Sequence, residues 1–476
     1  MKHNSQKISL YVLSFLLIFG FNSNLLLAKK LTLDEAIEIA IKNNQQTKMA
    51  KMEVDKAKFA VKEAYGYALP TVNFSASFAT FLEKSKMAFP DFGALIGNAT
   101  YGVLLEAGKI DSSQAKFRPI TSTLQSFAQT NNYEAKFELQ QILFNSAVFQ
   151  GIGASGTYLK TAQAGLKSQV AKTVLDVKKT YYGVLLAQEM VKLVESSMNN
   201  FENNVKNVEA YYKEGLVSEY QLLQAQVAME NFRPRVLMAQ NGYKNAIEGL
   251  KLILGAGQEE EIEVIGDLKK NELSQSDKER LLSDALNENL DLKTLKLKRD
   301  VDEAFIELDR SEYWPTLALF GNYSFNGSSN DFNFMNYRSS MVGLAFSINL
   351  FNGQRTNNKV QQSKIGVYKT DEQITQTKHF IEMSVKSKML DIERTVKLIT
   401  ANEKNIELAQ RAFKIAEIKI KEGTGTQLDI LNSELALREA QVNRLNSVYE
   451  YIIAKTELEN LTGEFNEEYL KLIDNK

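Results

Sequence analysis

The chain has 476 residues, a formal net charge of −1 and no cysteine. The missing cysteine excludes disulfides, thiol catalysis and thiolate metal sites, and the near-zero charge without a basic tail argues against a nucleic-acid partner. The length would suit two or three ordinary domains, but the patterns described below predict one architecture built from two similar halves.

The first 28 residues are typical of a secretory signal peptide. Lys2 and Lys7 precede an apolar run over residues 8–21, and Ala28 offers a small residue for cleavage. A transmembrane helix is the alternative, although the run is short for one. No later apolar stretch approaches the roughly twenty residues of a membrane-crossing helix, so a mature chain held in a bilayer would need a β-barrel.

Two long segments of the chain repeat without a gap. Residues 213–255 align with residues 421–463, and the tripeptide Lys-Glu-Gly at 213–215 recurs at 421–423. Upstream of both copies, matched residues, almost all apolar, fall seven apart, which indicates a heptad-patterned helix. Each copy therefore predicts a long helix, a glycine-containing turn and a returning helix. The first long helix, over about residues 146–213, would span on the order of 100 Å, the scale of a periplasm.

Four shorter runs alternate between apolar and polar residues, and Pro70 and Pro315 open two of them. The predicted strands cover about 71–81, 133–144, 316–325 and 341–350, with loops over about 83–132 and 326–340. Such alternation is typical of a strand with one face in lipid and one in water, and equally of an ordinary half-buried antiparallel strand. Four runs in the same order around a duplication favour a membrane barrel.

Four strands are too few to close a barrel around a lumen, because bacterial outer-membrane barrels start at about eight strands. An open sheet in lipid would leave two edges of unpaired backbone groups. Copies of the chain must therefore share the barrel. A trimer, with twelve strands, is the simplest closed ring, and a dimer would give a narrower one.

Aromatic residues cluster where the predicted strands meet helices. They are Tyr65, Tyr67, Phe144, Tyr313, Trp314 and Phe351. Such a cluster is typical of an interfacial belt at a membrane leaflet, and local packing at turns is the alternative.

Several short motifs accompany the repeat. They are Leu31-Thr32-Leu33-Asp34-Glu35-Ala36 with Asn43-Asn44, Ala68-Leu69-Pro70 before a strand, Leu350-Phe351-Asn352-Gly353 after the last strand, and the two repeated turns. In this order they resemble the TolC family of outer-membrane efflux proteins over nearly the whole mature chain. The resemblance implies a mainly α-helical protein with membrane β-strands: a trimeric 12-stranded β-barrel, four strands per chain, continuous with a long α-helical coiled-coil barrel.

The expected organisation has four parts. They are a signal peptide at 1–28, a first repeat at 29–255 with its hairpin tip near 215–218, a second repeat at 256–463 with its tip near 423–426, and a C-terminal tail at 464–476. Pro234 interrupts the returning helix of the first repeat, which predicts a local kink there.

The resemblance assigns both hairpin turns to a periplasmic tip where an adaptor protein docks. The expected docking residues are Gly215, Leu216, Val217, Ser218, Gly423, Thr424, Gly425 and Thr426. Glycine suits a sharp reversal because it adopts positive φ without steric penalty. The plainer alternative is that these residues only join helices.

The resemblance also places Asp429 at the aperture of the tunnel. Gln221 is its equivalent in the first hairpin, and Asn432 stands where the family often has a second aspartate. Three Asp429 carboxylates around a constriction would attract cations and repel anions. A solvated aspartate on a helix face is the alternative.

The implied function is a passive outer-membrane exit duct of a tripartite efflux or type I secretion system, extending into the periplasm. Its expected partners are two further copies of the chain, a periplasmic adaptor (membrane fusion) protein, an inner-membrane pump and outer-membrane lipid. The sequence holds only two histidines and no pair with metal-ligand spacing, so no catalytic residue, metal or cofactor is expected. The competing interpretation is a non-transporting periplasmic or surface scaffold, with a coiled-coil stalk and a soluble sandwich of strands.

Overall fold

The computed structural model describes residues 29–257, 259–269, 278–464, 469 and 471. The expected signal peptide at 1–28 and most of the expected tail at 464–476 therefore lie outside the described residues. The chain forms two compact units. Unit 1 contains the described residues of 1–59, 156–303 and 364–476, and unit 2 contains 60–155 and 304–363. No helix among the described residues is both long and apolar enough to cross a membrane.

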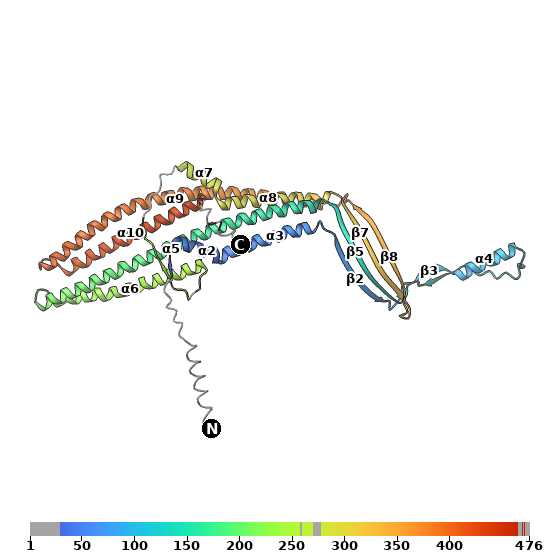
Figure 1. Cartoon of the computed structure of the whole chain (residues 1–476), viewed down its shortest axis with the longest axis horizontal. Helices are drawn as coiled ribbons and strands as arrows, with labels where there is room; N and C mark the ends of the chain where they lie inside the picture. The colour runs from blue at the N-terminus through green and yellow to red at the C-terminus, as the bar shows by residue number, and fades with distance from the viewer. Residues whose placement is uncertain (1–28, 258, 270–277, 465–468, 470, 472–476) are drawn as a thin grey trace, which may run out of the picture. The chain divides into compact units, whose positions relative to one another are not determined.

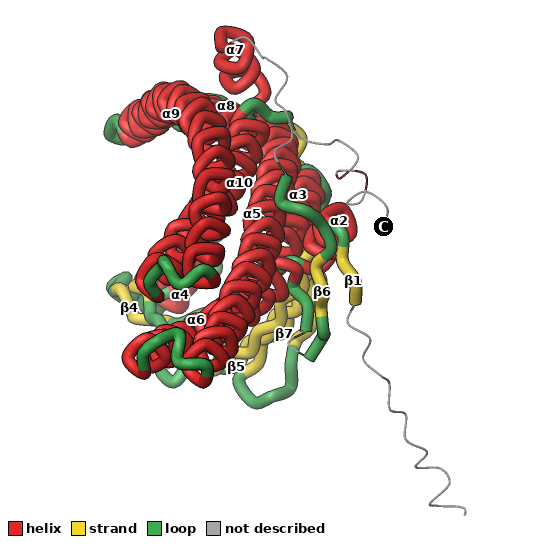
Figure 2. The backbone as a smooth tube through the Cα atoms, turned by 90° about the vertical axis from the view of Figure 1, so that its left-hand side faces the viewer, coloured by secondary structure: helices red, strands yellow, loops and turns green. Residues whose placement is uncertain are grey.

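Two antiparallel helical hairpins dominate unit 1. Helix α5 (Ser146–Lys213) returns as α6 (Glu219–Leu254), and α9 (Arg355–Lys421) returns as α10 (Gln427–Leu461). Both turns lie at the same end of the unit, and the four helices run side by side when viewed from that end (Figures 1 and 2). Helix α6 continues through Pro234 without a break.

The core of unit 1 follows the heptad pattern of α5. Val170, Val177 and Val184 are fully buried, and Val174 and Tyr181 lie between them on the same face. Residues spaced three and four apart form one apolar stripe along a helix, so this face packs against α2 (Leu33–Asn43), α6 and α10.

Two asparagines fasten short helices to the ends of the hairpins. Asn44 accepts a hydrogen bond from the backbone N–H of Gln46, at the start of α3 (Gln45–Gly66), and donates one to the carbonyl of Ile253 at 2.8 Å. Asn289 stands between α7 (Lys278–Glu288) and α8 (Leu290–Arg310) and donates in the same way to the carbonyl of Leu461 at 3.2 Å. The two halves of the chain thus share the same asparagine hydrogen bond between a short helix and the end of a hairpin.

Unit 1 also contains a short two-stranded parallel sheet. Strand β1 (Lys29–Leu31) pairs with β6 (Ile262–Val264). The hydroxyl of Tyr181 lies 3.0 Å from the carbonyl oxygen of Leu31 and also contacts that of Ile265. Burial raises the pKa of Tyr181 to about 12, so this side chain stays a neutral hydrogen-bond donor.

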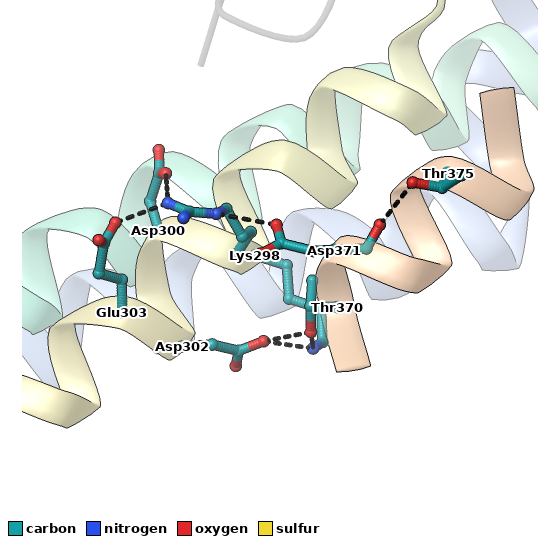
Figure 3. A network of polar contacts seen from close by, with 8 residues as sticks. Lys298, Asp300, Asp302, Glu303, Thr370, Asp371 and Thr375 are labelled. Atoms are coloured by element: carbon teal, nitrogen blue, oxygen red, sulfur yellow. Dashed lines mark hydrogen bonds and ion pairs between the residues drawn. The ribbon is translucent and has the colours of Figure 1, made fainter. Parts of the chain in front are cut away.

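A polar network joins α8 to α9 in unit 1 (Figure 3). Arg299 Nε lies 3.1 Å from Asp371 Oδ1. One turn further along, Asp302 accepts hydrogen bonds from Lys298 at 2.8 Å and from the Thr370 hydroxyl at 2.6 Å. Because two separate pairs cross between the helices, the register of α8 against α9 is fixed.

Unit 2 contains a four-stranded antiparallel sheet in the order β2-β5-β7-β8. The strands are β2 (Thr71–Thr80), β5 (Asn131–Asn145), β7 (Thr316–Ser329) and β8 (Met335–Ser347). The 3-10 turn η1 (Ser311–Tyr313) precedes β7. Strands β7 and β8 continue into the loop expected at 326–340, because the backbone of Asn326–Ser329 pairs with β5 and the start of β8 pairs with β7. Residues 348–350, expected to end the last strand, lie beyond β8.

The register gives the sheet one apolar and one polar face. Phe74 pairs with Phe137, which pairs in turn with Tyr323 on β7. The polar face carries Ser75, Lys136 and Ser324 at the next level. Both edge strands expose their apolar side chains: Val72, Phe74 and Phe78 on β2, and Val342, Leu344 and Phe346 on β8.

The segment expected as a loop over 83–132 is structured. It contains β3 (Met87–Pro90), helix α4 (Phe92–Glu106) and β4 (Ser122–Gln125), with β3 and β4 paired. This segment, called the insertion below, is anchored where Phe81 donates a backbone hydrogen bond to Thr130 at 2.8 Å and so continues the β2–β5 ladder.

Candidate functional site

The turn between α5 and α6 is closed by backbone hydrogen bonds at the end of α5. Gly215 has φ +74°, and its N–H bonds to the carbonyl of Tyr212 at 2.9 Å. The next N–H, of Leu216, reaches back to the carbonyl of Tyr211 at 2.9 Å. This pattern is a Schellman motif, which requires a left-handed residue and therefore favours glycine.

The turn between α9 and α10 uses the same motif and then tightens. Gly423 has φ +74° and donates to the carbonyl of Ile420, and Thr424 donates to that of Lys419. Gly425 adds a second donor to the Lys419 carbonyl at 3.0 Å. A Cβ on Gly425 would lie 2.9 Å from the backbone nitrogen of Ile420, so the second turn has no room for a side chain at this position.

Both returning helices begin with a capping box. The Ser218 hydroxyl accepts from the N–H of Gln221, whose side-chain oxygen accepts from the N–H of Ser218 at 3.0 Å. In the second hairpin Thr426 and Asp429 exchange the same bonds, with Asp429 Oδ2 2.8 Å from the Thr426 nitrogen. Bonds from the backbone and hydroxyl of Thr426 lower the pKa of Asp429. Its carboxylate therefore stays charged at neutral pH and suits a helix N-terminus.

The residues predicted for the tip and aperture are mostly accessible in the single chain. Leu216 and nearby Tyr220 are exposed by 66% and 69%. Asp429 and Asn432, three residues apart on α10, are both exposed, whereas Gln221 is half-buried. Gln221 and Asp429 hold equivalent places in their hairpins. Among residues 29–257, 259–269 and 278–464, no cluster of acidic or histidine side chains is arranged to hold a metal ion.

A buried ion pair above the second turn was not anticipated from the sequence. Glu434 and Arg438 on α10 are 4% and 9% exposed, and Glu434 Oε2 lies 3.3 Å from Arg438 Nη1. The Arg438 guanidinium sits 4.8 Å from the ring centre of Phe232 on α6, and Glu434 accepts a hydrogen bond from Ser197 on α5. The pair therefore links the two hairpins. Its sequence signal is an acidic and a basic residue four apart on α10.

Burial disfavours the charged form of both partners in this pair. Desolvation raises the pKa of Glu434, although Ser197 and Arg438 oppose the shift, and it lowers the pKa of Arg438. Desolvation of a close pair can exceed the attraction between its charges. The Glu434–Arg438 pair therefore positions the two hairpins against each other more than it stabilises the fold.

A cavity of about 140 Å³ lies next to this pair, between the two hairpins. Its lining combines amides, carboxylates and apolar side chains: Asn200, Phe201, Asn203, Asn204, Asn207, Tyr211, Phe413, Glu417, Ile420, Ile430 and Glu434. The hairpins are thus incompletely packed against each other close to their turns.

Comparison with known proteins assigns the chain to a family. The family model described as "Outer membrane efflux protein" matches residues 36–256 and 281–464, which together make up most of the chain. The chain belongs to the outer membrane efflux protein family. This assignment makes it an export duct of the bacterial outer membrane and favours transport over the scaffold interpretation. The family consists of channels and not of enzymes.

Named relatives agree with this assignment. Outer membrane protein TolC of Vibrio cholerae is 24% identical over 382 residues, covering 74% of this chain and 86% of the relative. Alkaline protease secretion protein AprF of Pseudomonas aeruginosa is 23% identical over 364 residues, covering 74% and 75%. The CmeC outer membrane channel of Campylobacter jejuni has a similar fold, with a TM-score of 0.70 at 16% identity over 93% of this chain and 89% of that one.

In this outer-membrane efflux protein, a second charged link joins the hairpins on the carboxyl-terminal half of α10. Glu457 lies 2.8 Å from Lys388 on α9 and also pairs with Lys179 on α5. Burial alone would raise the pKa of Glu457, but hydrogen bonds from the two lysines lower it below its ordinary value. Unlike Glu434, this carboxylate is stabilised in its charged form.

Proposed function

We propose that three copies of the chain close one barrel from their sheets and one tunnel from their hairpins, and that the tunnel tip docks a periplasmic adaptor. The observation that carries this proposal is the sheet itself, with an exposed apolar face, a polar face and two edge strands, β2 and β8. Edges left open in lipid would expose unpaired backbone groups that cost several kcal/mol each. Pairing β2 of one copy with β8 of the next removes every edge.

Strand directions support a closed ring. Successive strands in the order β2-β5-β7-β8 are antiparallel, so β2 and β8 run in opposite directions. A junction between neighbouring copies is then also antiparallel, as in bacterial outer-membrane barrels. Two copies would give eight strands and three give twelve. The TolC resemblance supports three, with each chain contributing two similar halves over 29–255 and 256–463.

The exposed aromatic residues support a membrane position for this barrel. Tyr65, Tyr67, Tyr313 and Trp314 precede β2 and β7 and are all exposed. At this end of the sheet they suit the interface between lipid and periplasm, where aromatic rings are enriched. The TolC resemblance assigns the hairpin tips to the periplasm. There the exposed Leu216 and Tyr220 would supply an apolar surface for the adaptor, which in turn serves an inner-membrane pump.

The aperture is proposed on the exposed side of α10. Asp429 carries a charge held by the capping box, and Asn432 presents a neutral amide on the same side of the helix. In a trimer these side chains would form one acidic and one amide ring around the constriction. Gln221 of the first hairpin adds no charge, so three carboxylates set its electrostatic preference.

Cysteine cross-linking tests the shared barrel directly, because the chain has no cysteine of its own. Ser75→Cys on β2 and Ser339→Cys on β8 place thiols on the polar face of the two edge strands. Within one copy two strands separate them by about 14 Å, so a shorter bis-maleimide favours links between copies. We expect a ladder ending at a closed trimer, and no ladder from Ser75→Cys alone. A water-soluble monomer that never cross-links would contradict the shared barrel.

Adaptor docking is tested separately at the second turn. Gly423→Val forces a β-branched residue into a left-handed conformation, which costs at least about 1–2 kcal/mol. Export and cross-linking to the adaptor should fall while the trimer remains, and Gly423→Asn should be tolerated because asparagine adopts positive φ more readily. Unchanged export and adaptor cross-linking in Gly423→Val would rule out this tip as the docking site.

A further inference from the structure

The insertion between β2 and β5 presents an apolar helix, α4, drawn in light blue in Figure 1. Asp91 caps its first turn by accepting from the N–H of Ala94 at 3.0 Å. The side chain of Asn98 makes two hydrogen bonds to the backbone of Arg118, at 2.7 and 2.8 Å. The ring of Tyr101 packs edge-on against Phe117. One face of α4 is thus held by the returning segment of its own chain.

The opposite face is apolar and exposed. Phe92, Ile96 and Val103 are 49%, 66% and 65% exposed, and Ala99 lies exposed between them. Their spacing is four, three and four residues, which is the a/d pattern of a coiled-coil seam. The residues that face the returning segment, Ala94 and Tyr101, fall at the f positions directly opposite this seam.

The seam points to another helix as its occupant. Leu95, 37% exposed, flanks the seam at a g position, so the apolar face has the width of a helix contact in a bundle. A helix that lies on lipid also carries a strongly charged face. Helix α4 has no charged residue before Glu106, its last. Nothing on the flanks of the seam therefore repels an identical helix.

The three-fold duct supplies such helices. The insertion joins the ends of β2 and β5 at the Phe81–Thr130 pair, so the three insertions of a trimer would rise from the same rim of the barrel, and the three-fold axis would give their helices the same direction along it. At 15 residues α4 is too short to associate by itself. Tethering to one rim supplies an effective concentration in the millimolar range for short linkers, which suffices for a weak seam.

We propose that the α4 helices of the three copies pack against one another along the seam formed by Phe92, Ile96, Ala99 and Val103, and so form a helical cap over the outer mouth of the duct. This proposal rests on the trimer proposed above. It adds an interface between copies that lies outside the barrel and outside the hairpins.

The test uses Ala99→Cys at the centre of the seam in the cysteine-free chain. Mild oxidation of the detergent-extracted trimer should give a disulfide-linked dimer on a non-reducing gel, since one disulfide can join two of three chains. Ser113→Cys is the matched control, because it is also small and exposed but lies on the returning segment. Adding Val103→Lys to Ala99→Cys should abolish the disulfide by charging the seam while the native mass stays that of a trimer.

The outcomes separate this inference from the duct itself. Several-fold more disulfide in Ala99→Cys than in Ser113→Cys, lost on adding Val103→Lys, supports the cap. Intact trimers in which the Ala99→Cys thiol stays reduced and open to maleimide overturn it, and leave the face to lipid or to another protein. A wild-type chain that is not a trimer overturns the shared barrel and this inference together.

Discussion

The two hairpin turns are closed by the same backbone motif and differ in the residues that follow it. Each has a glycine at φ +74° in a Schellman motif and a capping box that starts the returning helix. After the glycine, the first turn carries Leu216 and Val217 and the second carries Thr424 and Gly425. The residue that completes the box is neutral Gln221 in one and charged Asp429 in the other. The Schellman motif and the capping box are therefore common to both tips, and the residues between them differ.

The difference suggests a division of labour between the tips. The first exposes large apolar groups, Leu216 and Tyr220, which suit contact with another protein. The second is compact, since Gly425 brings the chain against the end of α9, and it carries the fixed charge of Asp429. Exchanging residues between the two turns tests whether each turn needs its own side chains for export.

The largest effect is expected when the second turn receives the residue of the first. In Gly425→Val a Cβ would meet the Ile420 nitrogen at 2.9 Å and the Lys419 Cβ at 2.9 Å, so the turn must open. Overpacking of this kind costs about 1–3 kcal/mol. We expect export to fall about tenfold or more, measured as accumulation of an exported dye, with the trimer intact.

The reverse exchange is the matched control. Val217→Gly removes a half-buried side chain from an open turn and should reduce export less than twofold. Equal losses in the two variants would show that the turns tolerate the same residues, and the tightness of the second turn would then have no functional role.

The regular elements of both units were accessible from sequence periodicity. The proline-free heptad run over 146–213 predicts the bounds of α5, and alternation predicts the four sheet strands to within a few residues at most ends. The exceptions are the paired ends of β7 and β8. Asn326–Ser329 is polar and reads as a loop, but its backbone completes the ladder with β5. Hydropathy does not report such pairing, because the ladder bonds are made by the main chain.

The helix in the insertion and the capping boxes at the turns were not predicted from the sequence. Glycines at 93, 97 and 102 and prolines at 90 and 119 predict a loop over the segment that contains α4. Contacts such as Asn98 with Arg118 nevertheless hold a helix there. At the tips, the spacing Ser218 to Gln221 and Thr426 to Asp429 was a readable capping-box signal.

An intermediate effect is expected from changing the charge of the residues that complete the two capping boxes. Asp429→Asn removes the charge but keeps an oxygen that can accept from Thr426, so the helix should still start at the same residue. The cation-to-anion permeability ratio of the trimer in a planar bilayer should move towards one. Gln221→Glu should not restore it if only the exposed side of α10 lines the aperture. A ratio unchanged in Asp429→Asn would return Asp429 to the role of a helix cap alone.

The smallest effect is expected in the pH dependence of stability, which should differ between the two charged links that join the hairpins. The pKa of Glu434 is raised in the folded chain, so its contribution to stability is present below the unfolded value of about 4.3 and is lost as pH rises through the folded value. The pKa of Glu457 is lowered, so its contribution is present above about 4.3 and is lost as pH falls through the folded value. The apparent Tm of the detergent-extracted wild type minus that of Glu434→Gln should therefore rise as pH falls from neutral towards about 4.3. The same difference for Glu457→Gln should stay flat over the same pH range and fall only in more acidic solution. Two differences that change in the same direction would contradict the opposite pKa shifts of the two carboxyl groups.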